Sequence, residues 1–247
     1  MSDKISSIAI MSDIHGNLQA LEAVMNDAEK YSLDGIILLG DLIDYGQQSN
    51  EVVHYLQEHI SCPIICNLWG NHEKAIFTED YGRFSSQRGK DCAKHTASIL
   101  EDSTKKYLET SCEKKCFLDF KLAGKHCLSI HGSLEDPAWK GIVQEDLQGN
   151  YQDYDVVFSG HTHYAHCFTK FYESNDERYR NKKAVLFINP GSVGQPRNHN
   201  PNAQYAVLEI PAWSVSLRSV PYDISGAMGL FHGQVDDFYR DRMKWGV

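Results

Sequence analysis

The chain has 247 residues, of which 42% are hydrophobic and 23% charged, close to the averages for globular proteins. Its net charge of −9 at pH 7 argues against a protein that binds nucleic acid regardless of sequence, because such binding needs a basic surface. The chain contains no apolar run of about 18 residues that could cross a membrane. Residues 1–5 show no signal-peptide core. We therefore expect one cytoplasmic domain over residues 1–247, with no membrane partner and no stable nucleic-acid partner.

The first part of the chain alternates predicted strands and helices. Short apolar runs rich in Ile and Val are typical of strands that are buried on both faces. Such runs occur at 8–11, 36–39, 64–66, 127–130 and 156–158. Helices are predicted at 18–25, where Asn17 can cap the first turn, and at 51–59.

A polar segment at about 74–110 interrupts this alternation and is predicted to be a helical insertion. Helices are expected within it near 90–100 and 104–108. An insertion at this point of the chain could form a lid or a wall of a substrate pocket. It could equally be a helical support that contacts no ligand, and the sequence leaves both possibilities open.

The later half is richer in predicted strands. Segments 116–122 and 125–130 flank Ala123-Gly124, which indicates a hairpin with a two-residue turn. Further strands are predicted at 168–172, 184–188, 205–210 and 213–220, and one or two helices at about 223–245, broken near Gly229 or Gly233. Two mixed sheets packed face to face with helices outside would account for these elements. The predicted fold is a four-layer α/β/β/α sandwich.

Five short polar clusters stand out because each follows one of the predicted buried strands. They are Asp13-Ile14-His15, Gly40-Asp41-Leu42-Ile43-Asp44, Gly70-Asn71-His72-Glu73, His131 and Gly160-His161-Thr162-His163. Ligands bind at the carboxyl edge of open α/β sheets, so these side chains should meet there. A mixed nitrogen and oxygen ligand set without thiolate suits Mn, Fe, Zn or Ni. Asp41, central in the set, is the natural carboxylate to bridge two ions about 3.5–4 Å apart.

Simpler interpretations exist for single members of these clusters. His161 and His163 could be ordinary loop residues, and Asp13 and Asp41 could cap the helices that follow them. Five coincidences of this kind in one chain are improbable, so a metal site is the better interpretation. The remaining histidines lack such neighbourhoods and are left out of the site: His54, His59, His95, His126, His166, His199 and His232.

The ordered motifs D-x-H, G-D-x-x-D, G-N-H-E, H and G-H-x-H resemble those of the calcineurin-like metallophosphoesterase superfamily. Asn189-Pro190-Gly191-Ser192 is similar to its small bacterial and archaeal, phosphodiesterase-like branch. The resemblance implies that His72 is a general acid oriented by Asp44. It also implies two metal sites, one of Asp13, His15, Asp41 and His163 and the other of Asp41, Asn71, His131 and His161.

This resemblance leads us to expect two-metal-dependent hydrolysis of a phosphoester by a metal-bridging hydroxide, with His72 protonating the leaving group. The expected substrate is a phosphodiester or a nucleotide or dinucleotide polyphosphate. Tyr45 follows Gly-Asp-x-x-Asp where the phosphoprotein phosphatase branch has Arg, which disfavours a phosphoprotein. The alternatives are a phosphomonoesterase, acting on a small molecule or a phosphoprotein, and a metal-bearing nucleotide-binding protein with little turnover.

The loop at 189–197 contains two glycines and two prolines and could meet an anion with its backbone N–H groups. Ser192 and Arg197 could add donors to a substrate phosphate, as could Asn71. Alternatively, the loop is a structural turn behind the site. The seven cysteines form no Cys-x-x-Cys pair, and we expect all of them to be reduced thiols. The sequence does not indicate the oligomeric state.

Overall fold

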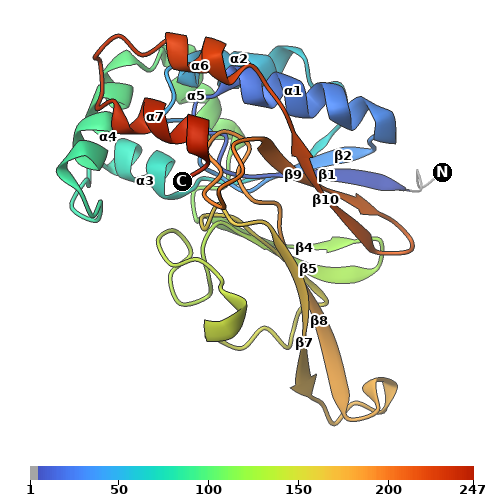
Figure 1. Cartoon of the computed structure of the whole chain (residues 1–247). Helices are drawn as coiled ribbons and strands as arrows, with labels where there is room; N and C mark the ends of the chain where they lie inside the picture. Colours follow the sequence, from blue (N-terminus) through green and yellow to red (C-terminus); the bar gives the residue numbers. More distant parts are fainter. Residues whose placement is uncertain (1–4) are drawn as a thin grey trace.

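The computed structural model of the protein describes residues 5–247, so the prediction about the first residues of the chain lies largely outside it. Two five-stranded sheets pack face to face, and most of the helices lie on the outer side of one of them (Figure 1). The predicted α/β sandwich with two mixed sheets is confirmed. A third element of the architecture, a long hairpin formed by two strands of the second sheet, extends away from the helices (Figure 1).

The first sheet has the strand order β10-β9-β1-β2-β3. The three parallel strands are β1 (Ser7–Met11), β2 (Gly35–Leu38) and β3 (Ile64–Asn67). Strands β9 (Ala203–Glu209) and β10 (Ser214–Val220) extend the sheet in antiparallel fashion beside β1. Because β1, β2 and β3 point the same way, the residues that follow them emerge at one edge.

The second sheet has the order β4-β5-β6-β8-β7. Strands β4 (Phe117–Leu122) and β5 (Lys125–Ile130) form the predicted hairpin, and both turn residues have positive φ, 46° at Ala123 and 82° at Gly124. Positive φ at both positions is what a two-residue hairpin turn of type I′ requires. The remaining strands are β6 (Val156–Ser159), β7 (His166–Glu173) and β8 (Lys182–Asn189).

All of the helices except α3 lie in segments that the sequence predicts to be helical. Helix α1 (Leu18–Ala28) is capped by Asn17, whose side chain accepts a hydrogen bond from the Ala20 N–H at 3.1 Å. The others are α2 (Ser49–Glu58), α3 (Asn71–Thr78), α4 (Gln87–Ile99), α5 (Asp102–Ser111), α6 (Ile224–Gly229) and α7 (Phe238–Trp245). The tail is thus two helices, and the break between them contains Gly233.

The buried strands alternate their side chains between two apolar layers, as a strand's period of two requires. Ile8, Ile10 and Ile37 point toward the second sheet and pack with Phe158 and Ile188. The alternate residues Ala9, Met11 and Leu38 pack beneath α1 and α2. The two outer faces differ, because the chain between β5 and β6 covers the second sheet with Ile142 and Tyr151 and forms only the short 3-10 helix Gln144–Asp146.

Each helix within residues 5–247 is either too short or too polar to cross a bilayer. All seven cysteines are free. Of these, Cys66, Cys92, Cys116 and Cys127 are buried. They act as small apolar residues in the packing.

Candidate metal centre

The five polar clusters meet at the carboxyl ends of the parallel strands. Asp13 and His15 follow β1, Asp41 follows β2, and Asn71 follows β3 and begins α3. From the second sheet, His131 follows β5 directly and His161 follows β6. Strands from both sheets therefore supply side chains to one place, and the buried strands hold their positions.

Asp13, His15 and His163 form the first group of possible ligands. His15 Nδ1 lies 3.2 Å from the Ile43 carbonyl oxygen and His163 Nδ1 lies 2.6 Å from that of Gln195. A carbonyl oxygen can only accept, so each Nδ1 carries the hydrogen and each Nε2 presents a lone pair. Yet these two Nε2 atoms are 3.2 Å apart, and His163 Nε2 is 3.0 Å from Asp13 Oδ1. Three electron-pair donors that converge in this way fit a cation between them.

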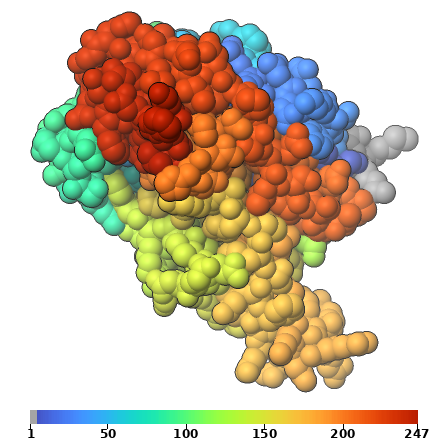
Figure 2. Space-filling view, viewed as in Figure 1, coloured from blue at the N-terminus to red at the C-terminus, as the bar shows by residue number. Residues whose placement is uncertain are grey.

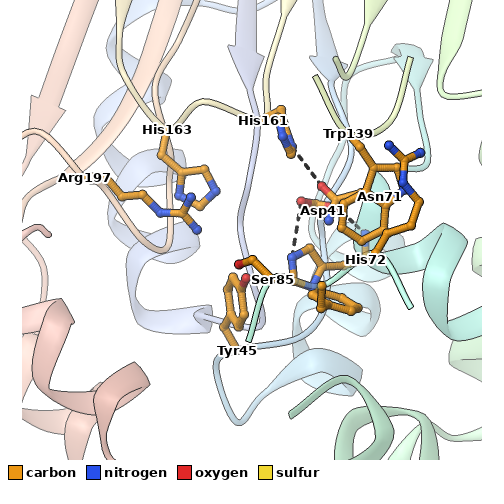
Figure 3. Close-up of a pocket in the computed structure, with 11 residues that line it drawn as sticks. Asp41, Tyr45, Asn71, His72, Ser85, Trp139, His161, His163 and Arg197 are labelled. Carbon is orange, nitrogen blue, oxygen red and sulfur yellow. Dashed lines mark hydrogen bonds and ion pairs between the residues drawn. The ribbon is translucent and has the colours of Figure 1, made fainter. Parts of the chain in front are cut away.

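The second group contains His131, Asn71, His161 and Asp41. His131 Nδ1 lies 2.7 Å from the Leu39 carbonyl oxygen, so by the same argument its Nε2 is a lone-pair donor. That Nε2 is 3.1 Å from Asn71 Oδ1 and 3.3 Å from Asp41 Oδ2. His161 Nδ1 lies 2.9 Å from the same amide oxygen of Asn71 (Figure 3). With these ring nitrogens deprotonated, all of these atoms would be lone-pair donors directed at one point, an arrangement that fits a cation.

Asp41 lies between the two groups. Its Oδ2 is 3.3 Å from His131 Nε2 in one group and 3.8 Å from His15 Nε2 in the other. Its Oδ1 accepts the backbone N–H of His72 at 2.9 Å, which fixes the plane of the carboxylate. Gly70 lets the chain pass this close, because a Cβ there would overlap Asp41 Oδ1.

Burial controls the protonation of the histidines. It lowers the pKa of His15, and it lowers that of His161 to about 3, so both rings are neutral near pH 7 and can donate lone pairs. Burial also lowers the pKa of His163, with the Arg197 cation acting in the same direction. His131 differs: burial would lower its pKa, but the neighbouring Asp41 carboxylate outweighs burial and raises it to about 9. A cation bound there would displace the proton of His131.

His72 forms a buried pair with Asp44, and the pair lies beside the two groups. His72 Nδ1 is 2.6 Å from Asp44 Oδ2, and the Thr96 hydroxyl donates to Asp44 Oδ1 at 2.7 Å. Burial would lower the pKa of His72, but the Asp41 and Asp44 carboxylates outweigh it and the pKa is raised. The free Nε2 of His72 lies 3.9 Å from Asp41 Oδ2, close enough for His72 to count as a further candidate ligand. A carboxylate-oriented imidazole with one free nitrogen can also act as an acid.

Many of these side chains come from backbone in the left-handed region. The φ angles are 54° at Asp13, 49° at His15, 54° at Asp41, 65° at His161 and 60° at His163. Residues other than glycine adopt such angles rarely, and they keep them only where the surroundings fix the turn. The sharp turns after the strands are what aim these short side chains at a common point.

Glu73 has a role that the sequence did not indicate. It is fully buried at the third position of α3, and its two carboxylate oxygens accept four backbone N–H groups. One oxygen accepts from Gly70 at 2.8 Å and Asp41 at 2.9 Å, and the other from Leu42 at 2.7 Å and Ile43 at 3.3 Å. Glu73 therefore ties the loop that carries Asp41 to the start of the helix that carries Asn71 and His72.

We expect Glu73→Gln to lower the free energy of unfolding by about 1–3 kcal/mol, because the NH2 of the new amide cannot accept and would face two backbone N–H donors. The loosened Asp41 loop should also bind metal more weakly. Urea unfolding and metal content after dialysis measure the two effects. Glu79→Gln, at the exposed end of α3, is the control. Unfolding and metal content equal to those of the wild type would contradict this role of Glu73.

A cavity of about 250 Å³ opens beside the candidate ligands. Asp41, Asn71, His72, His161 and His163 contribute to its lining, and Figure 3 shows them grouped around it. Its walls are formed by Tyr45, Arg83, Phe84, Ser85, Trp139 and Arg197. The segment between α3 and α4 thus supplies a wall through Arg83, Phe84 and Ser85, while Thr96 of α4 supports Asp44 from behind.

Of the three residues predicted to donate hydrogen bonds to the substrate, two line the cavity and one does not. Asn71 and Arg197 line the cavity, and the Arg197 guanidinium points toward it beside His163 (Figure 3). Ser192 does not line the cavity, so the prediction that it contacts the substrate is corrected. Its hydroxyl is buried, donates to the Asp13 carbonyl oxygen at 2.7 Å and accepts the Gln195 N–H at 2.8 Å. Ser192 has no donor left for a substrate and instead holds the loop of Asp13.

Comparison with known proteins gives consistent results. A sequence model of the calcineurin-like phosphoesterase superfamily domain matches residues 7–212. The chain is 28% identical over 228 residues to an uncharacterised protein of Methanocaldococcus jannaschii, and the match covers 90% of each. The crystal structure of a metallophosphoesterase from Sphaerobacter thermophilus shares 28% identity, covers 99% of this chain and 100% of that one, and has a TM-score of 0.73. A hypothetical protein from Pyrococcus horikoshii has the same fold at 16% identity, with a TM-score of 0.71 and 98% of each chain covered.

Proposed function

The chain belongs to the calcineurin-like phosphoesterase superfamily, and on this basis we propose that it uses two divalent metal ions to hydrolyse a phosphodiester or a nucleotide polyphosphate. The observation that carries the proposal is the position of Asp41 between two groups of lone-pair donors. One ion would be held by Asp13, His15, Asp41 and His163. The other would be held by Asp41, Asn71, His131 and His161. The nitrogen and oxygen donors suit Mn, Fe, Zn or Ni.

Two such ions, when bound, supply a water of lowered pKa and neutralise charge on the phosphoryl oxygens. The residues of the chain orient the reaction. Asn71 places its side chain in the cavity, where its amide can meet the substrate. His72 would donate the proton on Nε2 to the departing oxygen, while Asp44 accepts the hydrogen on Nδ1 and keeps the ring oriented. The raised pKa of His72 favours the protonated ring that this role needs.

The walls of the cavity support a substrate with an organic group next to the phosphate. Phe84 and Trp139 meet edge to face, with ring centroids 5.2 Å apart, and both border the cavity. Trp139 lies on the side of Asn71 in Figure 3, whereas Phe84 and Tyr45 both pack against the His72 ring. A diester or nucleotide could place its organic group there. We further propose that the chain acts as a single domain on small substrates in the cytoplasm, where its seven free cysteines would stay reduced.

The test is hydrolysis of bis-p-nitrophenyl phosphate and p-nitrophenyl phosphate by metal-stripped protein, with Mn, Ni, Zn, Fe or Mg added back. We expect activity only with added metal, highest with Mn or Ni, and greater on the diester. Greater activity on the monoester would instead assign the phosphomonoesterase alternative. Two bound ions per chain without hydrolysis of either compound would contradict the proposal and favour a nucleotide-binding role.

A further inference from the structure

Arg197 is a cation at the cavity that the protein does not neutralise. Four other arginines form ion pairs with aspartates, namely Arg83, Arg178, Arg218 and Arg240. Arg197 forms no ion pair with an Asp or Glu within residues 5–247, although the whole chain has a net charge of −9. Its Nε is buried without a hydrogen-bond partner, and a terminal nitrogen reaches Gln195 Oε1 at the long distance of 3.5 Å. Buried donors in proteins are nearly always satisfied, so this guanidinium lacks acceptors that a ligand could supply.

The guanidinium is directed at the place where the candidate metal ligands meet. Arg197 lines the cavity together with Asp41 and His163. In Figure 3 its guanidinium lies beside the His163 ring and points into the cavity. His163 belongs to one group of possible ligands and Asp41 lies between the two groups, so a phosphate held there would share the cavity with Arg197. The planar guanidinium can donate two parallel hydrogen bonds to such a phosphate.

The backbone on both sides of Arg197 is held in place. Two residues before it, the Gln195 carbonyl oxygen accepts from His163 Nδ1 at 2.6 Å. Two residues after it, the His199 N–H donates to the Gly246 carbonyl oxygen at 2.7 Å. The C-terminal segment accordingly lies against the loop near residue 200 (Figures 1 and 2). The Arg197 side chain therefore starts from a fixed backbone, which lowers the entropy that is lost when it binds a ligand.

Arg83, the other arginine of the cavity lining, is already engaged. Its guanidinium pairs with Asp136 at 2.6 Å, and its central carbon lies 5.1 Å from the centre of the Trp139 ring. The Arg83 side chain is also 51% exposed, so solvent and salt screen its charge. Arg197 is therefore the residue of the lining that brings a permanent positive charge without a counter-charge from the described part of the chain.

We propose that Arg197 binds the free oxygens of the reacting phosphate and thereby favours ester groups with two negative charges over those with one. This inference rests on the proposed function and deepens it, because it names a residue that sets the relative activity on monoesters and diesters. A phosphomonoester is mostly a dianion at pH 7, since its second pKa is about 6, whereas a diester carries one charge. The attraction to a cation grows with the charge of the anion. The monoester released from a diester should bind Arg197 as well and inhibit the enzyme.

Arg197→Gln tests this role with bis-p-nitrophenyl phosphate and p-nitrophenyl phosphate, which release the same leaving group. We expect kcat/KM on the monoester to fall about ten- to hundredfold, the range for hydrogen bonds between charged groups. On the diester it should fall about three- to tenfold, because the charge is half as large. The ratio of diester to monoester activity should therefore rise about three- to tenfold. Arg197→Lys should show a smaller rise, because the charge remains while the paired donors are lost.

Calorimetric binding of inorganic phosphate to metal-loaded protein gives a measurement that does not depend on turnover. We expect the Kd to rise about tenfold or more in Arg197→Gln. It should stay unchanged in the control Arg178→Gln, because Arg178 pairs with Asp176 between β7 and β8 and does not line the cavity. Metal content is determined for each variant, and if Arg197→Gln loses metal, Arg197→Lys is used for both comparisons.

The outcomes separate this role from the proposed function. Weaker phosphate binding in the variant of a protein that hydrolyses neither compound would support the role of Arg197 and contradict the proposed function. An equal decrease on both substrates, or an unchanged Kd for phosphate, in a variant that retains its metal would overturn the role of Arg197. The proposed function would then remain intact, because the wild type would still hydrolyse the diester with added metal.

Discussion

Asp41→Asn is expected to lower kcat on bis-p-nitrophenyl phosphate by about a thousandfold or more, since bound ions contribute several kcal/mol to stabilising the transition state. Asp41 Oδ2 lies within reach of both groups, 3.3 Å from His131 Nε2 and 3.8 Å from His15 Nε2. An amide at this position removes the negative charge that both groups share. Its oxygen could still accept the His72 N–H, now 2.9 Å from Oδ1, so the local backbone should remain in place.

The reason for the loss can be established by counting bound metal. Asp41→Asn should retain less than one tightly bound ion per chain where the wild type retains two, as determined by elemental analysis after dialysis. Asp91→Asn is a suitable control, because Asp91 is exposed on α4, away from the candidate ligands, and accepts a hydrogen bond from Gln87 at 2.8 Å. Full metal content together with full activity in Asp41→Asn would show that Asp41 is not a shared ligand. Full metal content with lost activity would assign Asp41 to the reaction rather than to metal binding.

The sequence predicted the positions of the candidate ligands because each one follows a strand closely. Asp13 is the second residue after β1, and His131 is the first after β5. Buried parallel strands are easy to recognise from continuous apolar runs, and their carboxyl ends share one edge. Once the strands are placed, the residues that follow them have little freedom. The same reasoning predicted the hairpin at Ala123-Gly124 and the cap at Asn17, which depend only on neighbouring residues.

The residues that the sequence missed depend on packing between distant segments. Thr96 reaches Asp44 from the middle of α4, and Trp139 borders the cavity from the chain that follows His131. Nothing in their sequence neighbourhoods distinguishes them from other polar or aromatic residues. Ser192 was misassigned because the composition of its loop indicated a turn, but not that its hydroxyl would point toward the Asp13 backbone. Helix α7 meets the loop that follows Arg197 only because the tail folds back, as the hydrogen bond from the His199 N–H to the Gly246 carbonyl oxygen shows.

His72→Gln should slow hydrolysis selectively for substrates with poor leaving groups. For thymidine 5′-(methyl phosphate) we expect kcat to fall by about 10²- to 10⁴-fold, the usual contribution of a positioned acid. For thymidine 5′-(p-nitrophenyl phosphate) the decrease should stay within about tenfold, since p-nitrophenolate leaves readily without a proton. Asp44→Asn should lower both kcat values as His72→Gln does, because the His72 ring would lose the carboxylate that accepts from Nδ1, now 2.6 Å from Asp44 Oδ2.

Metal content separates the two roles that the geometry allows for His72. Its Nε2 lies 3.9 Å from Asp41 Oδ2, so the ring could bind an ion as well as donate a proton. If His72 is the acid, His72→Gln keeps both ions and strongly slows only the substrate with the poor leaving group. As a ligand, it loses metal and slows both substrates equally. His72 Nδ1 hydrogen-bonds to Asp44, and the Thr96 hydroxyl donates to the same carboxylate at 2.7 Å. This pairing favours the role of acid, because Asp44 stabilises the protonated ring. A histidine that binds a metal ion must give up the proton on the binding nitrogen. His166→Gln, a partly buried histidine at the start of β7, controls for general loss of stability.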